Sequence, residues 1–295
     1  MNTDDRVEDF ARSDPNWLDR VVHYYDQTRF DYRTVWHNSD NLAFHFGHYE
    51  PGIHEHAHAL SNANQVLARI ARIEAGNRVL DAGCGVGGSS LWLARHLAVD
   101  VVGITPVEHQ VAMAREVTRS RGLQHRATFE RAEYTRVPFP DASFDVVWAL
   151  ESLCHAVDKR AFYREARRLL RPGGRLVVAE YVRTTRHLDP ETNKLMGEWL
   201  AGWSMPDIDT AGEHVRAAED AGFAGVRLVD HTWSTRRSLR RLDKLSLAAW
   251  PVNQVLHGLG LRSKVQHSNV VASRRQYELL KRGAWFYGIV SGIKP

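Results

Sequence analysis

Short apolar runs alternate with amphipathic stretches through the middle of the chain. Runs rich in Val, Ile, Leu and Phe predict strands at 78–82, 99–104, 127–130, 144–150 and 175–182. Apolar residues three or four positions apart predict helices between them, at 89–97, 106–121 and 158–170. Strands that alternate with helices form βαβ units. The pattern therefore predicts an α/β fold with a doubly wound, mostly parallel, Rossmann-like sheet.

Patterns on either side of this core divide the chain into four parts. We expect an N-terminal helical arm or lid over 1–75, a core over 76–183, a helical cap insertion over 184–210 and the rest of the core with cap helices over 211–295. The last part contains two further predicted strands, at 222–233 and 286–293, which give the sheet seven strands. Between them, 234–256 predicts a helix that is first basic and then apolar.

The first core strand ends in an acid and continues into a glycine loop. Asp81 is followed by Gly83, Gly85 and Gly87, and a helix begins at once. Glycine lets the backbone approach a ligand closely, and the amides at the start of a helix attract a polar or anionic group. A dinucleotide-binding loop has much the same pattern. Because such a loop is usually followed by a ribose-binding acid about where Thr105 stands, the sequence argues against an ordinary nicotinamide site.

Composition and charge restrict the partners and the compartment. The net charge of +4 and the pI near 9.1 are mildly basic, and the two signs of charge are interspersed, so we expect no nucleic-acid partner. Cys84 and Cys154 provide no disulfide framework, and the sequence has no signal-like segment and no run of about 18 apolar residues. We expect a cytoplasmic protein without a membrane span, and leave a homo-oligomer open.

Two clusters of charged or metal-ligating residues need an interpretation. Histidines alternate at 54, 56 and 58, but helical spacing puts only the first and last on one face, so we expect no metal site. The densest basic cluster lies on the predicted helix at 234–256 and suits either a solvated helix face or contact with a diphosphate or an anionic surface. Its members are Arg236, Arg237, Arg240 and Arg241.

Four ordered motifs resemble those of the class I S-adenosylmethionine-dependent methyltransferases. They are the strand and glycine loop at 79–85, the acid Glu133 after Ala132, the segment 139–147 and the turn at 170–176. The resemblance covers roughly 76–183, and Glu133 stands where aspartate is more usual. A narrower resemblance, to the sterol, tocopherol and prenyl-chain branch, rests on further positions: Thr105 with Gln110, 151–155, 24–25 and 45–49.

This resemblance implies S-adenosylmethionine as the methyl donor and S-adenosylhomocysteine as its product. Asp81 and the glycine-loop amides would hold the amino acid part of the donor, Thr105 and Gln110 its ribose, and Glu133 its adenine. Thr105 could equally be only the cap of the following helix. The implied cofactor-binding positions are Asp81, Gly83, Gly85, Gly87, Thr105, Gln110, Ala132, Glu133 and Leu150.

The acceptor decides which further groups are needed. A sulfonium methyl is already electrophilic, so the protein mainly excludes water and aligns the nucleophile. Methylation of an alkene leaves a carbocation, which calls for aromatic faces and a proton acceptor, whereas a hydroxyl or amine needs only a base. The candidate catalytic residues are Glu180, His155, Tyr24 and Tyr25. The candidate substrate-pocket residues are Phe46, Glu151, Tyr181, Trp199 and Trp203, although the tryptophans equally suit an ordinary core.

We therefore predict C-methylation of an isoprenoid or similarly hydrophobic small molecule of specialised metabolism, at an alkene carbon, with Glu180 or His155 as proton acceptor. O- or N-methylation of a phenolic or amine natural product, with His155 alone as base, is the first alternative. A catalytically silent protein that binds S-adenosylmethionine is the second. Mg²⁺ is expected only if the acceptor carries a diphosphate.

Overall fold

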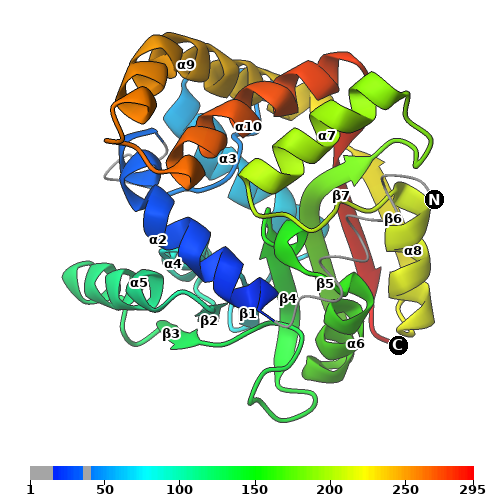
Figure 1. Ribbon diagram of the computed structural model, residues 1–295. Coiled ribbons are helices and arrows are strands. Elements are labelled where there is room, and N and C mark those ends of the chain that lie inside the picture. The colour runs from blue at the N-terminus through cyan, green and yellow to red at the C-terminus, as the bar shows by residue number, and fades with distance from the viewer. Residues whose placement is uncertain (1–15, 36–40) are drawn as a thin grey trace.

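A seven-stranded sheet forms the centre of the protein. The computed structural model describes residues 16–35 and 41–295. The strand order is β3-β2-β1-β4-β5-β7-β6, and β7 runs opposite to the other six described strands (Figure 1). The strands are β1 (Arg78–Ala82), β2 (Asp100–Thr105), β3 (Ala127–Arg131), β4 (Phe144–Leu150), β5 (Leu170–Arg183), β6 (Ala224–Asp230) and β7 (Trp285–Ile293). The predicted fold class and strand number are confirmed, and the reversal of strand order between β1 and β4 creates the crevice where such sheets bind ligands.

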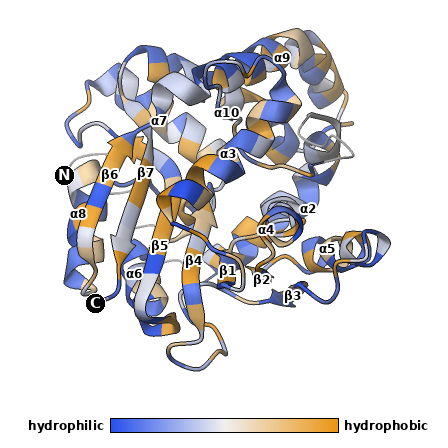
Figure 2. Cartoon of the chain, turned by 180° about the vertical axis from the view of Figure 1, so that it is seen from behind, coloured by the Kyte–Doolittle hydropathy of each residue, from blue (hydrophilic) through white to orange (hydrophobic). Residues whose placement is uncertain are grey.

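Helices cover both faces of this sheet, as expected for a doubly wound fold. One face carries α3 (His56–Ile70), α4 (Gly88–Leu97) and α5 (Glu108–Ser120), while the other carries α6 (Lys159–Leu169) and α8 (Ala211–Asp220). Along β4, Val146 and Trp148 belong to the first core, and Val147 and Ala149 belong to the second. This alternation is the period-two pattern of a strand buried on both faces, and Figure 2 shows the hydrophobic colour concentrated in the strands.

A further helical layer lies beyond the carboxyl ends of the central strands. It consists of α2 (Trp17–Val35), α7 (Pro190–Gly202), α9 (Thr232–Gly258) and α10 (Lys264–Lys281), and α10 contacts the other three (Figure 1). A short 3₁₀ turn, η1 (Leu153–His155), follows β4 at this edge. In the described residues, no helix has the length and apolar character needed to cross a membrane.

Three local predictions were wrong or incomplete. The sequence pattern gave no indication of α10. The predicted turn at 172–174 lies inside β5, which begins at Leu170 and shifts register against β4 near Phe144. The helix predicted from Pro106 begins at Glu108 with Val107 as its N-cap, so Thr105 is the last residue of β2 and not the cap.

Candidate active site

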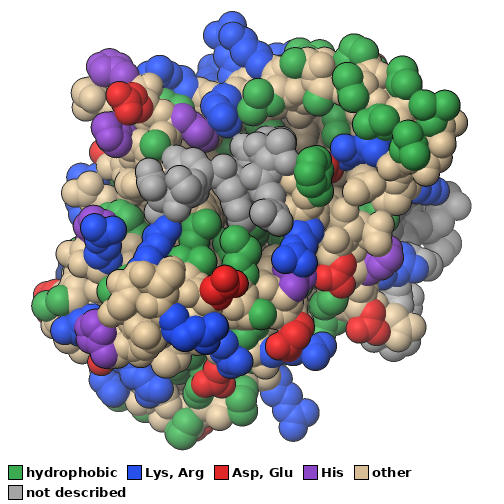
Figure 3. Space-filling model, turned by 90° about the vertical axis from the view of Figure 1, so that its left-hand side faces the viewer, with side chains coloured by type: hydrophobic (Ala, Val, Ile, Leu, Met, Phe, Trp, Pro, Cys, Tyr) green, Lys and Arg blue, Asp and Glu red, His purple; other side chains and the backbone are tan. Residues whose placement is uncertain are grey.

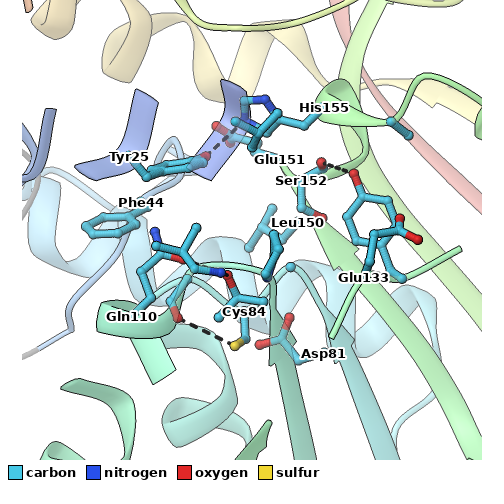
Figure 4. A pocket seen from close by; sticks show the side chains of 18 of the residues that line it. Tyr25, Phe44, Asp81, Cys84, Gln110, Glu133, Leu150, Glu151, Ser152 and His155 are labelled. Carbon is cyan, nitrogen blue, oxygen red and sulfur yellow. Dashed lines mark hydrogen bonds between the residues drawn. The ribbon is translucent and has the colours of Figure 1, made fainter. Parts of the chain in front are cut away.

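A cavity of about 380 Å³ opens at the crevice between β1 and β4. Its wall comes from the glycine loop, the carboxyl ends of β1, β2 and β4, the segment 133–135, the segment 42–45, η1 and α2. This volume falls in the range of small-molecule sites, about 300–1,000 Å³. Figure 4 shows Asp81 and Cys84 at one end of the cavity, and Tyr25 and His155 at the other.

The glycine loop and Asp81 form the first end. The Asp81 carboxylate is 2% exposed and accepts a hydrogen bond from the Ser90 hydroxyl at 2.5 Å. Burial raises its pKa to about 6. Gly83 has a φ of +92°, and a Cβ there would lie 2.3 Å from the Ser152 Cβ, so only glycine fits this turn. Backbone therefore forms the cavity wall next to a buried acid.

Thr105 and Gln110 lie beside this end and are joined to each other. The Thr105 hydroxyl donates to Gln110 Oε1 at 2.7 Å and accepts from the Val107 amide at 3.3 Å. Both side chains are about 97% buried and line the cavity. The bond between them fixes the end of β2 to the first turn of α5.

Glu133 and Leu150 complete the cofactor positions that the structure brings together. The Glu133 carboxylate accepts from the amide and the hydroxyl of Thr135. Two predicted positions lie outside the wall: Gly87, where a Cβ would meet the Phe129 ring, and Ala132, whose amide donates to the Thr105 carbonyl.

Tyr25 and His155 meet at the second end of the cavity (Figure 4). His155 Nδ1 faces the Ser204 carbonyl at 3.0 Å and must donate to it, so Nε2 accepts the Tyr25 hydroxyl proton at 2.9 Å. Burial lowers the pKa of His155 to about 4, which keeps its imidazole neutral near pH 7. Trp17 on α2 also donates from Nε1 to the His155 carbonyl, at 3.2 Å.

Glu151 is the first residue after β4 and lines the cavity. Its φ of +52° is left-handed, a conformation that costs a residue with a Cβ about 1–2 kcal/mol. Glu151 Oε1 accepts from the Phe46 amide and the Tyr287 hydroxyl, both at 2.8 Å, and Oε2 accepts from the Tyr181 hydroxyl at 2.9 Å. Burial raises the pKa of Glu151 to about 7, so near neutral pH this carboxyl exists in both forms.

Glu180 does not line the cavity. Its fully buried carboxyl lies beneath η1, where Oε2 accepts from the Cys154 amide at 2.7 Å and Oε1 from the Tyr181 amide at 2.9 Å. Burial raises the pKa of Glu180 to about 8. The carboxyl holds η1 against β5 and is separated from the cavity by the turn it supports.

The other predicted aromatic residues also lie outside the cavity wall. Tyr24 joins α2 to α10, because its hydroxyl donates to Asn269 Oδ1 at 2.9 Å. Trp199 on α7 packs against Trp285 with ring centroids 5.0 Å apart, and Trp203, Tyr181 and Phe46 belong to the same core. The tryptophans thus adopt the core role that the sequence left open.

Sequence reasoning missed much of the wall that α2 and the segment 42–45 supply. Trp17, Val21 and Tyr25 recur every four residues and face the cavity, a spacing that could have indicated one helix face. His45 also lines the cavity, and its Nε2 is buried without a hydrogen-bond partner in the described structure. Asp81, Glu133 and His45 Nε2 are all acceptors, which suits a ligand that carries cationic or N–H groups.

Known proteins resemble this chain in sequence and in fold. Residues 80–178 match the family model described as a methyltransferase domain. Methyltransferase GfsG of Streptomyces halstedii is 39% identical over 218 residues, which cover 73% of this chain and 77% of that protein. The chain belongs to the S-adenosylmethionine-dependent methyltransferases. Cycloartenol-C-24-methyltransferase 1 of Oryza sativa subsp. japonica is 33% identical to this methyltransferase over 211 residues. The matched residues cover 70% of the present chain and 60% of the rice protein.

Solved structures extend the likeness to almost the whole methyltransferase. The [4+2]-cyclase SpnF has a TM-score of 0.75 at 26% identity, and the match covers 93% of this chain and 95% of that one. Geranyl diphosphate C-methyltransferase from Streptomyces coelicolor A3(2) has a TM-score of 0.72 at 19% identity, over 96% and 99% of the two chains, and shares the fold. By their backbone and acceptor groups, the glycine loop, Asp81 and Glu133 are the residues that would hold the donor, which would supply an electrophilic methyl group.

Proposed function

We propose that this methyltransferase transfers a methyl group from S-adenosylmethionine to an alkene carbon of an uncharged, isoprenoid-like small molecule. The observation that carries the proposal is Glu151, a residue of the cavity wall whose carboxyl accepts hydrogen bonds from Phe46, Tyr181 and Tyr287 and whose pKa burial raises to about 7. Its wall neighbours Trp17, Tyr25 and Phe44 are aromatic. Relatives at 31–34% identity act at carbon C-24 of sterols by name, which supports carbon as the methylated atom.

The chemistry needs one proton acceptor and faces that tolerate positive charge. A new C–C bond forms as the methyl–sulfur bond breaks, and the second alkene carbon becomes a cation. Aromatic faces stabilise a nearby cation by about 0.5–2 kcal/mol each. Loss of a proton from a neighbouring carbon to the Glu151 carboxylate then restores an alkene. Glu151 thereby takes the role that the sequence assigned to Glu180.

An uncharged acceptor is favoured over a diphosphate. No Lys or Arg belongs to the described cavity wall, whereas six acids and histidines do: His45, Asp81, Glu133, Glu151, His155 and Asp158. Phosphate groups are bound by Arg, Lys or metal ions in proteins. The described residues contain no group of three or more His, Cys, Asp or Glu residues that could hold a metal ion. We expect Mg²⁺ only if the acceptor carries a diphosphate.

O- or N-methylation is the second candidate, favoured by the bond between Tyr25 and His155. A neutral imidazole could take the proton of an acceptor hydroxyl through the Tyr25 oxygen. The low pKa of His155 makes it a weak base, since it holds a proton only below about pH 4. Glu151 suits proton transfer at neutral pH better.

The test is incubation with ¹³C-methyl S-adenosylmethionine and a panel of prenyl alkenes, prenyl diphosphates with and without Mg²⁺, and phenols. S-adenosylhomocysteine formation measures turnover, and NMR locates the labelled methyl. A ¹³C–C product from an uncharged prenyl alkene supports the proposal. An O- or N-linked methyl replaces it with the second candidate. Activity only on diphosphates contradicts the uncharged acceptor, and absence of S-adenosylhomocysteine with all acceptors contradicts methyl transfer.

A further inference from the structure

The C-terminal half of α9 carries exposed apolar side chains. Val252 and Val255 are 60% and 61% exposed, and Leu259 and Leu261 in the following turn are 67% and 69% exposed. From Leu245 to Leu261 the sequence contains no Asp, Glu, Lys or Arg. We call this stretch, 245–261, the apolar tip. Figure 3 shows hydrophobic side chains gathered at the upper right, where the α9–α10 turn lies. Apolar surface concentrated in this way marks an interaction site.

Basic residues border the apolar tip on both sides. Arg240 and Lys244 precede it on α9, Lys264 follows it, and all three are exposed. Arg240 and Lys244 lie one turn apart, as do Val255 and Leu259, and the 11 residues from Lys244 to Val255 are about three turns, so the two pairs lie on one side of the helix. Arg240 and Lys244 form no ion pair within the described residues. The basic residues are therefore available beside the apolar surface.

Basic residues outnumber acids along the sequence around the tip. Between Asp230 and Glu278 the chain has nine Lys and Arg residues and a single acid, Asp243, and two of the nine, Arg262 and Arg275, form ion pairs with Asp31 and Glu198. Burial raises the pKa of Asp243, and Lys281 and Arg274 on α10 are close enough to oppose this rise, so Asp243 lies on the α10 side. A second copy of the chain would bring the same basic residues to a symmetric contact. An anionic partner complements this charge, and an anionic lipid surface also accepts the apolar side chains.

The apolar tip is also fixed to the helix that covers the cavity. Arg262, just after the tip, donates from Nη2 to Asp31 Oδ2 on α2 at 2.6 Å. Gln266 Nε2 donates to the Gln27 carbonyl, one further turn along α10, at 3.1 Å. The same α2 supplies Trp17 and Tyr25 to the cavity wall. A surface that holds the tip therefore also holds the cavity-covering helix near that surface.

We propose that the apolar tip and its basic borders dock this methyltransferase on the surface of an anionic lipid bilayer. Leucine and valine side chains enter the interface between headgroups and acyl chains, and Arg240, Lys244 and Lys264 contact the lipid phosphates. Binding of the protein to the bilayer is reversible, because only a few apolar side chains enter the interface. It requires no methyl transfer, so it stands or falls independently of the proposed reaction.

Sedimentation with phosphatidylcholine vesicles, with and without phosphatidylglycerol, tests this docking. The full chain should bind the mixed vesicles more tightly, and added salt should weaken binding. Replacing two tip residues, Val255→Asp with Leu259→Asp, should lower vesicle affinity at least tenfold. Replacing two basic residues, Arg240→Gln with Lys244→Gln, should lower it about 25-fold, about fivefold for each charge near the surface. Val229→Asp is the matched control, because Val229 is 51% exposed on β6, away from the tip.

Each result has a defined meaning. Equal binding to both vesicle types, or unchanged binding by the basic-residue variant, overturns the proposal. So does a concentration-dependent dimer in light scattering that the tip variant dissociates, because a second copy then occupies the surface. Circular dichroism verifies that the variants fold. If the tip variant does not, the basic-residue variant and the salt dependence decide, since both leave the apolar side chains unchanged.

Discussion

Tyr25 on α2 donates its hydroxyl proton to Nε2 of His155 on η1, 130 residues later in the chain. The Ser204 carbonyl fixes the donor direction, because it occupies the other imidazole nitrogen. This bond is one direct tie between the helix that covers the cavity and the edge of the sheet. The pair thus joins the helix that covers the cavity to the wall at its second end.

Tyr25→Phe removes this bond and keeps the ring. We expect amide hydrogen exchange in residues 17–35 to become about fivefold faster, since a hydrogen bond of this kind contributes about 1 kcal/mol. Exchange followed by mass spectrometry measures the change. Tyr134→Phe is the control, because its hydroxyl lies in the same cavity but donates to the Ser152 carbonyl and not to a residue of α2. Equal exchange in α2 of the wild type and Tyr25→Phe would show that this bond does not hold the helix.

Glu151→Gln tests the proton acceptor. Because burial raises the pKa of Glu151 to about 7, its carboxylate form is lost as pH falls through 7. Turnover of an alkene acceptor should therefore rise with pH and level off above about pH 8. The glutamine variant should lose at least about 100-fold in turnover, the lower range for removal of a general base. Glu180→Gln is the control and should retain turnover, because its carboxyl faces η1. A flat pH profile in the wild type would argue against Glu151.

Glu180→Gln should instead change how stability depends on pH. The pKa of Glu180 is near 8 in the folded protein and near 4.5 when the chain is unfolded. Its contribution to the free energy of unfolding is therefore fully present below pH 4.5 and is lost as pH rises toward 8. The variant cannot titrate and loses one acceptor for a backbone amide, so we expect it to be about 1–3 kcal/mol less stable at pH 5. Urea unfolding at pH 5 and pH 8 measures whether this deficit narrows; parallel curves would rule out the titration.

Asp81→Asn should weaken donor binding. The carboxylate is the charged acceptor next to the glycine loop, and a hydrogen bond to a charged group contributes about 1.5–3 kcal/mol, or about 10- to 100-fold in Kd. In the wild type, affinity should also fall as pH drops below 6, the pKa to which burial raises Asp81. Calorimetry with S-adenosylhomocysteine measures both effects. Asp100→Asn, at the exposed start of β2, should keep the wild-type Kd, and an unchanged Kd in Asp81→Asn would exclude Asp81 from the donor site.

The part of the site that lies at strand ends could be predicted from the sequence. Asp81, Thr105 and Glu151 each stand at or just after the carboxyl end of a parallel strand, and such ends meet at one edge of a sheet. The end of the strand that carries Glu180 was predicted to within one residue, but the position of the Glu180 side chain was not. The Cys154 and Tyr181 amides hold its carboxyl below η1, and not at the open edge.

The helical layer was harder to predict because its packing uses small and polar side chains. The buried positions of α10 are Ala272, Ser273, Gln276 and Leu279, of which only one is a large apolar residue. Hydrophobic periodicity alone does not distinguish such a helix from a loop. The role of the cap tryptophans was left open by the sequence for a different reason. Helical spacing put Trp199 and Trp203 on one face, but it does not indicate whether a core or a cavity lies opposite.

Because the backbone at Glu151 is left-handed, variants chosen for higher stability are expected to replace this residue, whereas the proposed reaction needs its carboxyl. Glycine or asparagine adopts that conformation at lower cost, so a library screened for thermal resistance would drift toward them at this position. The selected variants would lack the carboxyl that we propose as the proton acceptor. Protein engineering that aims to raise the thermal stability of this protein should therefore keep Glu151 unchanged and substitute other positions.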